Sequence, residues 1–176
     1  LTDGASVIIN SDGTVSVVAA DGNPASAGTP VSFNGAATRD TVATFDSNSN
    51  KVVLAYRDLG SSQHGYAIVG TVDPSDNSIS FGSEARIANF SGGTIISNVA
   101  ITFDSNSNKV VIAYKDEGNS FYGTTVVATV SGTSISFGTP VVHSSATTGD
   151  HALTFDSNSN KVVVGYTYGA KVGTVS

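Results

Sequence analysis

Cysteine, methionine and tryptophan are absent from this 176-residue chain, and only 12% of its residues are charged. Without cysteine there are no disulfides and no thiolate metal ligands. A cysteine-free chain is compatible with both oxidising and reducing compartments. The eight Lys and Arg residues are scattered and the net charge is −6, so no nucleic-acid partner is expected. No apolar run approaches the ~20 residues of a membrane helix, so no membrane span is expected.

The residues that are present favour short strands joined by tight turns. Nineteen glycines and abundant Ser, Thr and Asn suit such turns. Residues that favour helices are scarce, and only two glutamates, Glu84 and Glu117, occur. The length fits one domain. The composition favours an extracellular or virion-surface location, and the start at Leu1 leads us to expect a processed or excised segment.

One phrase, Phe-Asp-Ser-Asn-Ser-Asn-Lys-Val-Val, occurs three times without change, at Phe45–Val53, Phe103–Val111 and Phe155–Val163. Its aspartates are spaced by 58 and then 52 residues. Identical segments at such a period identify a repeat protein, in which each unit buries its apolar surface only against its neighbours.

Four strand signals recur within each period. The second is an unbroken apolar run, and the fourth alternates between apolar and polar residues. The predicted ranges are Val42–Phe45, Ala100–Phe103 and Ala152–Phe155 for the first strand; Val52–Tyr56, Val110–Tyr114 and Val162–Tyr166 for the second; Tyr66–Val72, Thr124–Val130 and Lys171–Val175 for the third; and Ile79–Phe81 running on through Ala85–Ile87, and Ile135–Phe137 running on through Pro140–Val142, for the fourth.

These patterns predict an all-β fold of antiparallel four-stranded units. An unbroken apolar strand needs cover on both faces, and the connections are too short for crossover helices. Radially packed β-propeller blades meet both conditions, with a stacked β-solenoid or a β-sandwich as alternatives. A two-layer sandwich would leave one face of Val52–Tyr56 wet.

The repeat boundaries give one domain made of a partial propeller of about three blades. Val7–Ile9, a Ser11–Gly13 turn and Thr14–Val18 resemble the third and fourth strands of an earlier blade, and Gly28–Phe33 mirrors Gly138–Val142. The predicted units are residues 1–34 as a partial blade, 35–90 as blade 1, 91–144 as blade 2 and 145–176 as an incomplete blade 3. Known propellers have four or more blades, so further copies in cis or in an oligomer are expected as partners.

The repeated Asp-Ser-Asn-Ser-Asn turn imitates the front half of a calcium loop. A lysine (Lys51, Lys109 or Lys161) occupies the place of the calcium-loop glycine, and no acid follows. We therefore expect a hairpin turn, in which Asp accepts N–H groups and an Asn is left-handed, and no cofactor. Calcium is the alternative, held by Asp46, Asn48, Asn50, Asp104, Asn106, Asn108, Asp156, Asn158 and Asn160.

The loops that differ between repeats are those from the second to the third strand and those between blades. In a propeller these loops share one face, and loops on a rigid scaffold often bind ligands. Aromatic and planar polar side chains there suit sugars. The alternative is that the loop sequences vary without selection for binding, and that Tyr66 and Tyr122 pack between blades. The candidate binding residues are Arg57, Asp58, His64, Tyr66, Lys115, Asp116, Glu117, Phe121, Tyr122, His143, Asp150 and His151.

Catalytic interpretations find little support, and no enzyme is expected. Arg39, Arg57 and Arg86 match the arginine triad of sialidases only in number, because the Ser-x-Asp-x-Gly-x-Thr-Trp box is missing. A glycosidase carboxylate pair could come only from Asp58, Asp116 and Glu117. A metal triad of His64, His143 and His151 is less expected than isolated histidines.

The repeat resembles those of virion and tail-fibre proteins of marine bacteriophages, and more distantly kelch-like and FG-GAP propellers. Val99–Asp116 and Thr129–Pro140 carry this resemblance best, and it covers most of Thr38–Ser176. It implies a structural and recognition module of a viral fibre or surface adhesin, which binds cell-surface glycan or a partner protein. The alternatives are a calcium-dependent adhesive repeat and, less favoured, a glycoside hydrolase.

Overall fold

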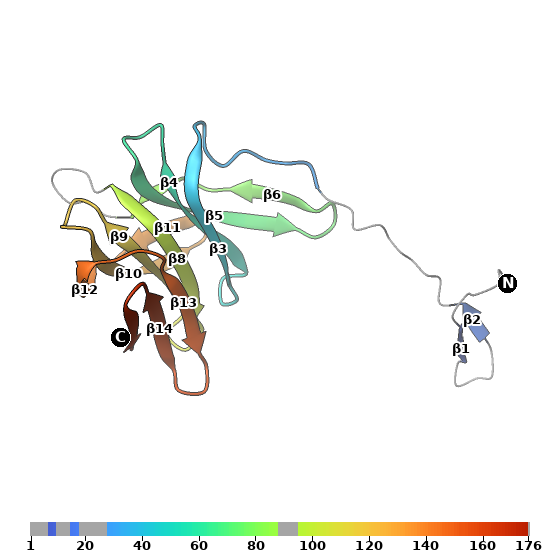
Figure 1. Ribbon diagram of the computed structural model, residues 1–176. Coiled ribbons are helices and arrows are strands. Elements are labelled where there is room, and N and C mark those ends of the chain that lie inside the picture. Colours follow the sequence, from blue (N-terminus) through green and yellow to red (C-terminus); the bar gives the residue numbers. More distant parts are fainter. Residues whose placement is uncertain (1–6, 10–14, 18–27, 88–94, 176) are drawn as a thin grey trace.

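The computed structural model describes residues 7–9, 15–17, 28–87 and 95–175. These residues form strands and turns, and no helix is found among them. The predicted all-β class and the antiparallel pairing are confirmed. Figure 1 shows the strands in chain order.

Three antiparallel sheets contain most of the strands, one for each copy of the repeated phrase. Sheet 1 comprises β3 (Thr38–Asp46), β4 (Lys51–Asp58), β5 (His64–Asp73), β6 (Ser78–Phe81) and β7 (Ala85–Arg86). Sheet 2 comprises β8 (Ile96–Asp104), β9 (Lys109–Asp116), β10 (Tyr122–Ser131), β11 (Ser134–Phe137) and β12 (Val141–Thr147). Sheet 3 comprises β13 (Ala152–Asp156), β14 (Lys161–Tyr166) and β15 (Gly169–Gly173).

The predicted four-strand unit is confirmed in sheets 1 and 2, including its interrupted last strand. β6 and β7 both pair with β5, and β11 and β12 both pair with β10, in the order of the sequence. Each break falls at a glycine, Gly82 or Gly138. The predicted third strand of the last repeat was placed two residues late, because the short Thr167–Tyr168 connection lets pairing begin at Gly169.

The Asp-Ser-Asn-Ser-Asn segment forms the predicted hairpin turn in every repeat. Oδ1 of Asp46 accepts the backbone N–H groups of Asn48 and Ser49 at 2.9 and 3.1 Å, and Asp104 and Asp156 accept the equivalent groups. The last Asn of each turn is left-handed, with φ of 54°, 55° and 53° at Asn50, Asn108 and Asn160. The carboxylate and the αL residue together close the hairpin between the first and second strands.

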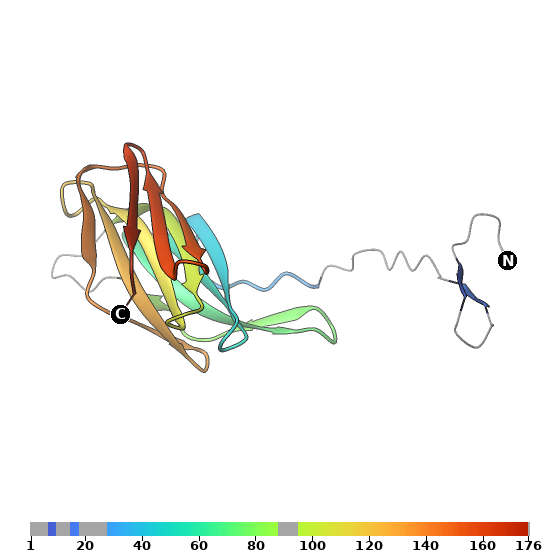
Figure 2. The ribbon, with the colours of Figure 1, turned by 90° about the horizontal axis from the view of Figure 1, so that it is seen from below.

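The three sheets pack face to face, and their first strands lie side by side. β8 contacts β3 on one side and β13 on the other. The turned view of Figure 2 shows the teal, yellow and red sheets following one another. The core between sheets 1 and 2 includes Val53, Val69, Ile87, Val110 and Ile135. The described residues form no closed ring. The structure therefore shows stacked antiparallel sheets, and the propeller stays a prediction.

Cover on both faces of the second strand is complete only in the middle sheet. Every residue of Val110–Tyr114 in β9 is buried. In β4, by contrast, Val52 and Leu54 are only half-buried, and so is Val163 in β14. Among the described residues, the outer sheets 1 and 3 each have a neighbouring sheet on one face only, so cover on both faces is shown for β9 alone and stays a prediction for the other two runs.

The first part of the chain matches its prediction in part. β1 (Val7–Ile9) and β2 (Val15–Val17) pair in a two-stranded sheet of their own, while the expected turn at Ser11–Gly13 lies outside the described residues. Residues 28–37 form no strand, unlike the mirrored β12. Phe33 nevertheless packs on Tyr56 and Phe81, with ring centroids 5.1 and 5.9 Å apart, and covers part of the outer face of sheet 1.

Candidate functional site

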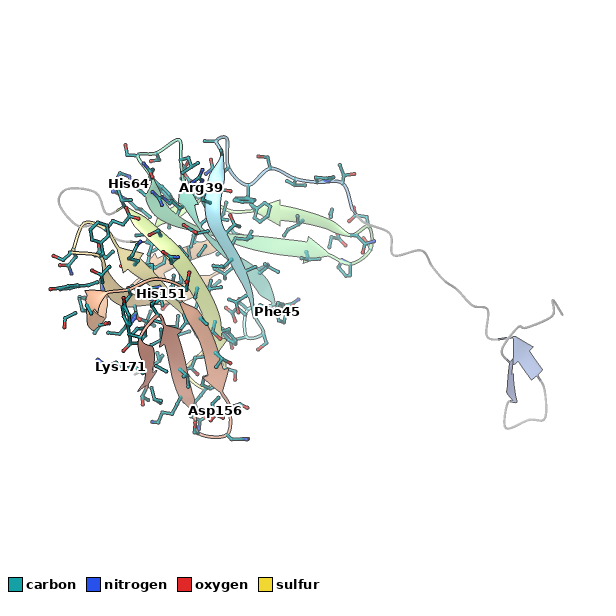
Figure 3. The ribbon with its side chains drawn as sticks, in the orientation of Figure 1. Arg39, Phe45, His64, His151, Asp156 and Lys171 are labelled. Atoms are coloured by element: carbon teal, nitrogen blue, oxygen red, sulfur yellow. The ribbon has the colours of Figure 1, made fainter. Side chains whose placement is uncertain are left out.

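The candidate binding residues gather at one end of the sheets, here called the loop end, where the second and third strands of each sheet are joined. In Figure 3, Arg39 and His151 lie at the loop ends of β3 and β13, and Phe45 and Asp156 lie at the opposite ends. Several residues expected in loops in fact belong to strands. These are Arg57, Asp58, His64, Lys115, Asp116, Tyr122 and His143.

Asp58 and Asp116 fold the loops rather than reach into solvent. Both are buried, and Oδ1 of each accepts a backbone N–H two residues on, from Gly60 at 2.7 Å and from Gly118 at 3.0 Å. Burial raises the pKa of the Asp116 carboxyl, and the turn N–H groups oppose that shift. Both carboxylates therefore take part in closing their loops.

Arg57 and Glu117 join the loop ends of sheets 1 and 2. Arg57 Nη1 lies 3.7 Å from Glu117 Oε1, and the same oxygen accepts the Ser97 hydroxyl at 2.7 Å. Arg57 also donates to the Gln63 side-chain oxygen. Both ends of the ion pair are largely covered, so the pair fixes the two loops relative to each other.

Phe121 and Tyr168 are exposed aromatic side chains on the loops of neighbouring sheets. Their exposed fractions are 45% and 77%. Thr148 N donates to Phe121 O at 3.0 Å, and Gly149 N donates to Thr167 Oγ1 at 2.9 Å, so one short segment connects both loops. The Lys115 ammonium lies 5.6 Å from the Phe121 ring centroid, within the range of a cation–π contact.

Two of the three histidines come together. The rings of His143 and His151 are 5.2 Å apart, and Tyr166 lies 5.2 Å from His143. Burial, reinforced by the charges of His151 and Lys171, lowers the pKa of His143 to about 4. Burial also lowers the pKa of His151, whose Nδ1 lies 3.0 Å from the Asn98 carbonyl oxygen. Both imidazoles are therefore neutral at pH 7.

His64 is elsewhere, at the start of β5, where it forms an isolated bridge with Ile95. Among the residues with a described position, no group of three or more His, Cys, Asp or Glu side chains is arranged to hold a metal ion. The three arginines come from three strands of sheet 1. Arg39 and Arg57 are cross-strand partners, and Arg86 on β7 faces Tyr66.

The two tyrosines weighed as packing residues differ in their contacts. Tyr66 stacks on Tyr56 at 6.3 Å, and its hydroxyl is 2.9 Å from the Ser61 hydroxyl. Tyr122 begins β10 opposite Asp116 and is only half-buried. The contact shown for Tyr66 is therefore with its cross-strand partner in sheet 1, and packing between blades stays a prediction.

The sequence reasoning named Asp150 but missed that it belongs to a row of equivalent polar residues on or just before the first strands. Asp40, Asn98 and Asp150 occupy equivalent repeat positions, all with φ between 46° and 52°, and pairing shifts register at the first two. Asn98 Nδ2 donates to Asp150 Oδ1 at 3.3 Å, across sheets 2 and 3. Their spacing of 58 and 52 residues equals that of the repeated phrase and could have identified them. Tyr168, in the loop between the second and third strands of the last repeat, was also missed.

Comparison of the chain with family models, with curated proteins and with solved structures gives no match. Within the described ranges, no helix has the length and apolar character needed to cross a bilayer.

Proposed function

We propose that the chain is a structural and recognition module of a viral fibre or surface adhesin, located on a virion or outside the cell. In this proposal the sheets are blades of a β-propeller, with β3, β8 and β13 nearest its axis. The adjacency of these three first strands supports that arrangement. The module binds cell-surface glycan through its loop end, and its role is recognition rather than catalysis.

The observation that carries the glycan proposal is the exposed aromatic pair. Phe121 and Tyr168 expose large ring surface on loops that Thr148 and Gly149 connect. Sugar rings present apolar C–H faces that pack on aromatic rings, and their hydroxyl groups need planar polar partners nearby. Lys115, against Phe121, is a donor beside the rings. Rigid aromatic side chains give contact area at a low cost in conformational entropy.

A glycan array and a cell-binding assay with the full chain test this proposal. We expect retention on a subset of glycans, and at least a tenfold loss of binding for each of Phe121→Ala and Tyr168→Ala. Phe45→Ala is the matched control, because Phe45 is also exposed (53%) but lies at the opposite end of its sheet. No retention on any glycan, or equal losses for all three variants, would contradict the proposal.

A further inference from the structure

Two histidines lie in the interface between sheets 2 and 3, at positions where the interface between sheets 1 and 2 has apolar side chains. These interfaces are called here junction 2–3 and junction 1–2. Ile87 and His143 each lie five residues after the glycine that breaks the fourth strand, and Val99 and His151 each lie five residues before the aspartate of the repeated phrase. Ile87 and Val99 are 1% and 6% exposed and belong to the core of junction 1–2. The repeat therefore contains the same place in an apolar form and in an ionisable form.

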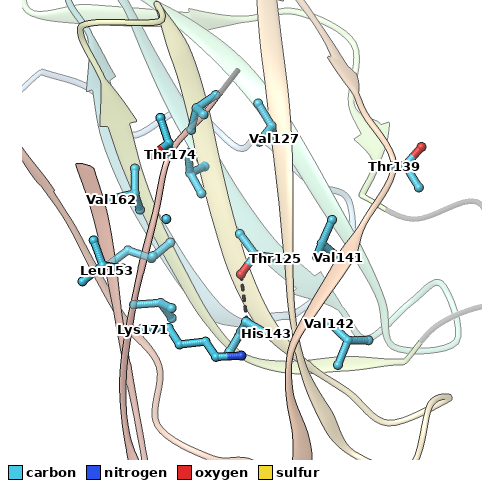
Figure 4. Close-up of a pocket in the computed structure, with 15 residues that line it drawn as sticks. Thr125, Val127, Thr139, Val141, Val142, His143, Leu153, Val162, Lys171 and Thr174 are labelled. Carbon is cyan, nitrogen blue, oxygen red and sulfur yellow. Dashed lines mark hydrogen bonds between the residues drawn. The ribbon is translucent and has the colours of Figure 1, made fainter. Parts of the chain in front are cut away.

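One nitrogen of each imidazole has a partner. The His143 Nδ1 lies 2.9 Å from Thr125 Oγ1 on β10, a contact that the dashed line in Figure 4 marks. The His151 Nδ1 lies 3.0 Å from the Asn98 carbonyl oxygen on β8. The His143 ring also packs on the backbone of Gly123, where an added Cβ would collide with the ring. Both rings are therefore held in place, and their centroids are 5.2 Å apart.

The other nitrogen of each imidazole is buried without a partner. Neither His143 Nε2 nor His151 Nε2 has a hydrogen-bond partner among the described residues. Tyr166 of β14 packs on the His143 ring from sheet 3, with centroids 5.2 Å apart. Protonation would place an N–H group and a positive charge at a buried site without an acceptor, which costs free energy as long as the junction is closed.

The charges around the two rings also oppose protonation. The Lys171 side chain on β15 extends toward His143 (Figure 4), and the charge of Lys115 on β9 acts on His151. Both lysines carry the same sign of charge as an imidazolium, and two imidazoliums would repel each other. Among the described residues, Asp150 is the carboxylate whose charge favours protonation of His151, and one of its oxygens already accepts an amide N–H from sheet 2. Proton uptake by the pair is therefore unfavourable while the junction is closed.

We propose that junction 2–3 is an acid-sensitive joint, in which proton uptake by His143 and His151 separates sheet 3 from sheet 2 while junction 1–2 stays closed. The Thr148–Gly149 segment lies between the two histidines in the chain. It is hydrogen-bonded to Phe121 in the loop of sheet 2 and to Thr167 in the loop of sheet 3. Separation must break one of these two connections, so acid also changes the arrangement of the loop end. The inference does not depend on the proposed glycan binding.

The expected size of the effect follows from the burial of the rings. Burial, with the charges of His151 and Lys171, lowers the pKa of His143 to about 4, whereas an exposed imidazole has a pKa of about 6.5. The open form therefore binds the proton more tightly, and acid favours opening. The effect is absent well above pH 6.5, and at pH 5 the opening equilibrium rises about thirtyfold from His143 alone. Burial also lowers the pKa of His151, which acts in the same direction.

A matched pair of introduced thiols can test this joint, because the chain has no cysteine. Val53 of β4 and Val111 of β9 occupy the same place in the repeated phrase and are 0% and 2% exposed. Val53 belongs to the core of junction 1–2, whereas Val111 lines a cavity in junction 2–3. The rate at which each thiol reacts with dithiodipyridine, divided by the rate for the same variant unfolded in urea at the same pH, measures the opening equilibrium of its junction. EDTA in all buffers keeps metal ions off the imidazoles.

Between pH 7.5 and pH 5 we expect this ratio to rise at least tenfold for full-length Val111→Cys and less than about threefold for Val53→Cys. A ratio for Val111→Cys that does not change with pH would overturn the proposal. So would parallel increases for both variants, because the chain would then open as a whole rather than at one joint.

The histidine pair itself is tested in the Val111→Cys chain by giving junction 2–3 the side chains of junction 1–2. His143→Ile with His151→Val should reduce the rise to less than about threefold, because Ile87 and Val99 are the equivalent residues and do not titrate. Circular dichroism checks that the double variant is folded at both pH values. Each single substitution should leave an intermediate rise. An undiminished rise in the folded double variant, or a single variant identical to the parent chain, contradicts the proposal.

Discussion

At the scale of single residues, the repeats supply their own controls, because equivalent positions carry the same side chain in different surroundings. Tyr56 and Tyr114 are equivalent, and both are fully buried. The Tyr56 hydroxyl donates to Glu84 at 2.8 Å, whereas Pro140 stands at the corresponding position in sheet 2, and the Tyr114 hydroxyl has no hydrogen-bond partner among the described residues. Burial raises the pKa of both phenols, so both are neutral at any ordinary pH.

Removing the two hydroxyls should therefore have different effects. Tyr56→Phe should lower the free energy of unfolding by about 1 kcal/mol, because a hydrogen bond is lost and Glu84 loses a partner. Tyr114→Phe should be neutral or stabilising, because an unsatisfied buried polar group is removed. Urea denaturation of both variants measures the difference. Equal losses would contradict the hydrogen-bond assignment.

His143 makes stability depend on pH. Its pKa is about 4 in the folded chain and about 6.5 when unfolded, so the unfolded state takes up the proton first as pH falls. The stabilisation is fully present above pH 6.5 and is lost as pH falls toward 4, at up to about 1.4 kcal/mol per pH unit. The groups that face this ring are Thr125 on β10, Tyr166 on β14, Lys171 on β15 and His151 just before β13.

Urea denaturation at pH 7.5, 6, 5 and 4.5 measures this loss. His143→Ile is the control, since Ile87 occupies the equivalent position in sheet 1. The Ile variant should lose less stability than the parent chain between pH 6.5 and 4.5, with the remaining slope due to other groups. If both chains lose stability in parallel over this range, His143 is not the titrating group.

At the scale of elements, the hairpin turn is complete without a metal ion. In Asp46 and Asp156 both carboxylate oxygens accept hydrogen bonds from the turn, with a serine hydroxyl on Oδ2 at 2.7 Å. These bonds lower the pKa of Asp156, whose side chain is exposed. Calcium would need six to eight oxygens, and one carboxylate beside a lysine does not provide them.

We therefore expect EGTA to leave the melting temperature unchanged, and added calcium chloride to leave it unchanged as well. Differential scanning calorimetry at constant ionic strength is the measurement. A decrease of several degrees in EGTA that calcium restores would show that the turns hold calcium and would revive the calcium-dependent alternative.

Stacking predicts unequal costs for equivalent substitutions in the second strands. Ile112 in β9 is completely buried, whereas its equivalent Leu54 in β4 is half-buried. Ile112→Ala should cost about 2–5 kcal/mol of unfolding free energy, the usual range for a well-packed site. Leu54→Ala should cost less than half of the Ile112→Ala value. Equal costs, measured by urea denaturation, would contradict the view that only the middle sheet is covered on both faces.

The sequence predicted much of the fold because turn chemistry and periodicity are local. The Asp carboxylate and left-handed Asn of each hairpin, and the break of the fourth strand before Ala85, follow from residues a few positions apart. What depends on distant neighbours could not be predicted. Leu54 and Ile112 have almost the same sequence context and differ only in whether a sheet lies on the second face. The link between Asn98 and Asp150 likewise joins different repeats.

At the scale of the whole molecule, the account describes a stack of sheets that cover one another. The middle sheet is complete and covered on both faces, while the outer sheets keep one face partly open. The candidate site follows from this stack. Equivalent loops lie at one end, so the loops that carry Phe121 and Tyr168 are both hydrogen-bonded to the Thr148–Gly149 segment.

Hydrogen–deuterium exchange of the full chain, read by mass spectrometry, tests the stacking most directly. The peptides that cover β4, β9 and β14 have nearly identical sequences, so their intrinsic exchange rates are nearly equal. The account predicts that amides of Val110–Tyr114 in β9 exchange slowest, and that those of Val52–Tyr56 and Val162–Tyr166 exchange faster. Exchange in β9 as fast as in the other two strands would contradict it.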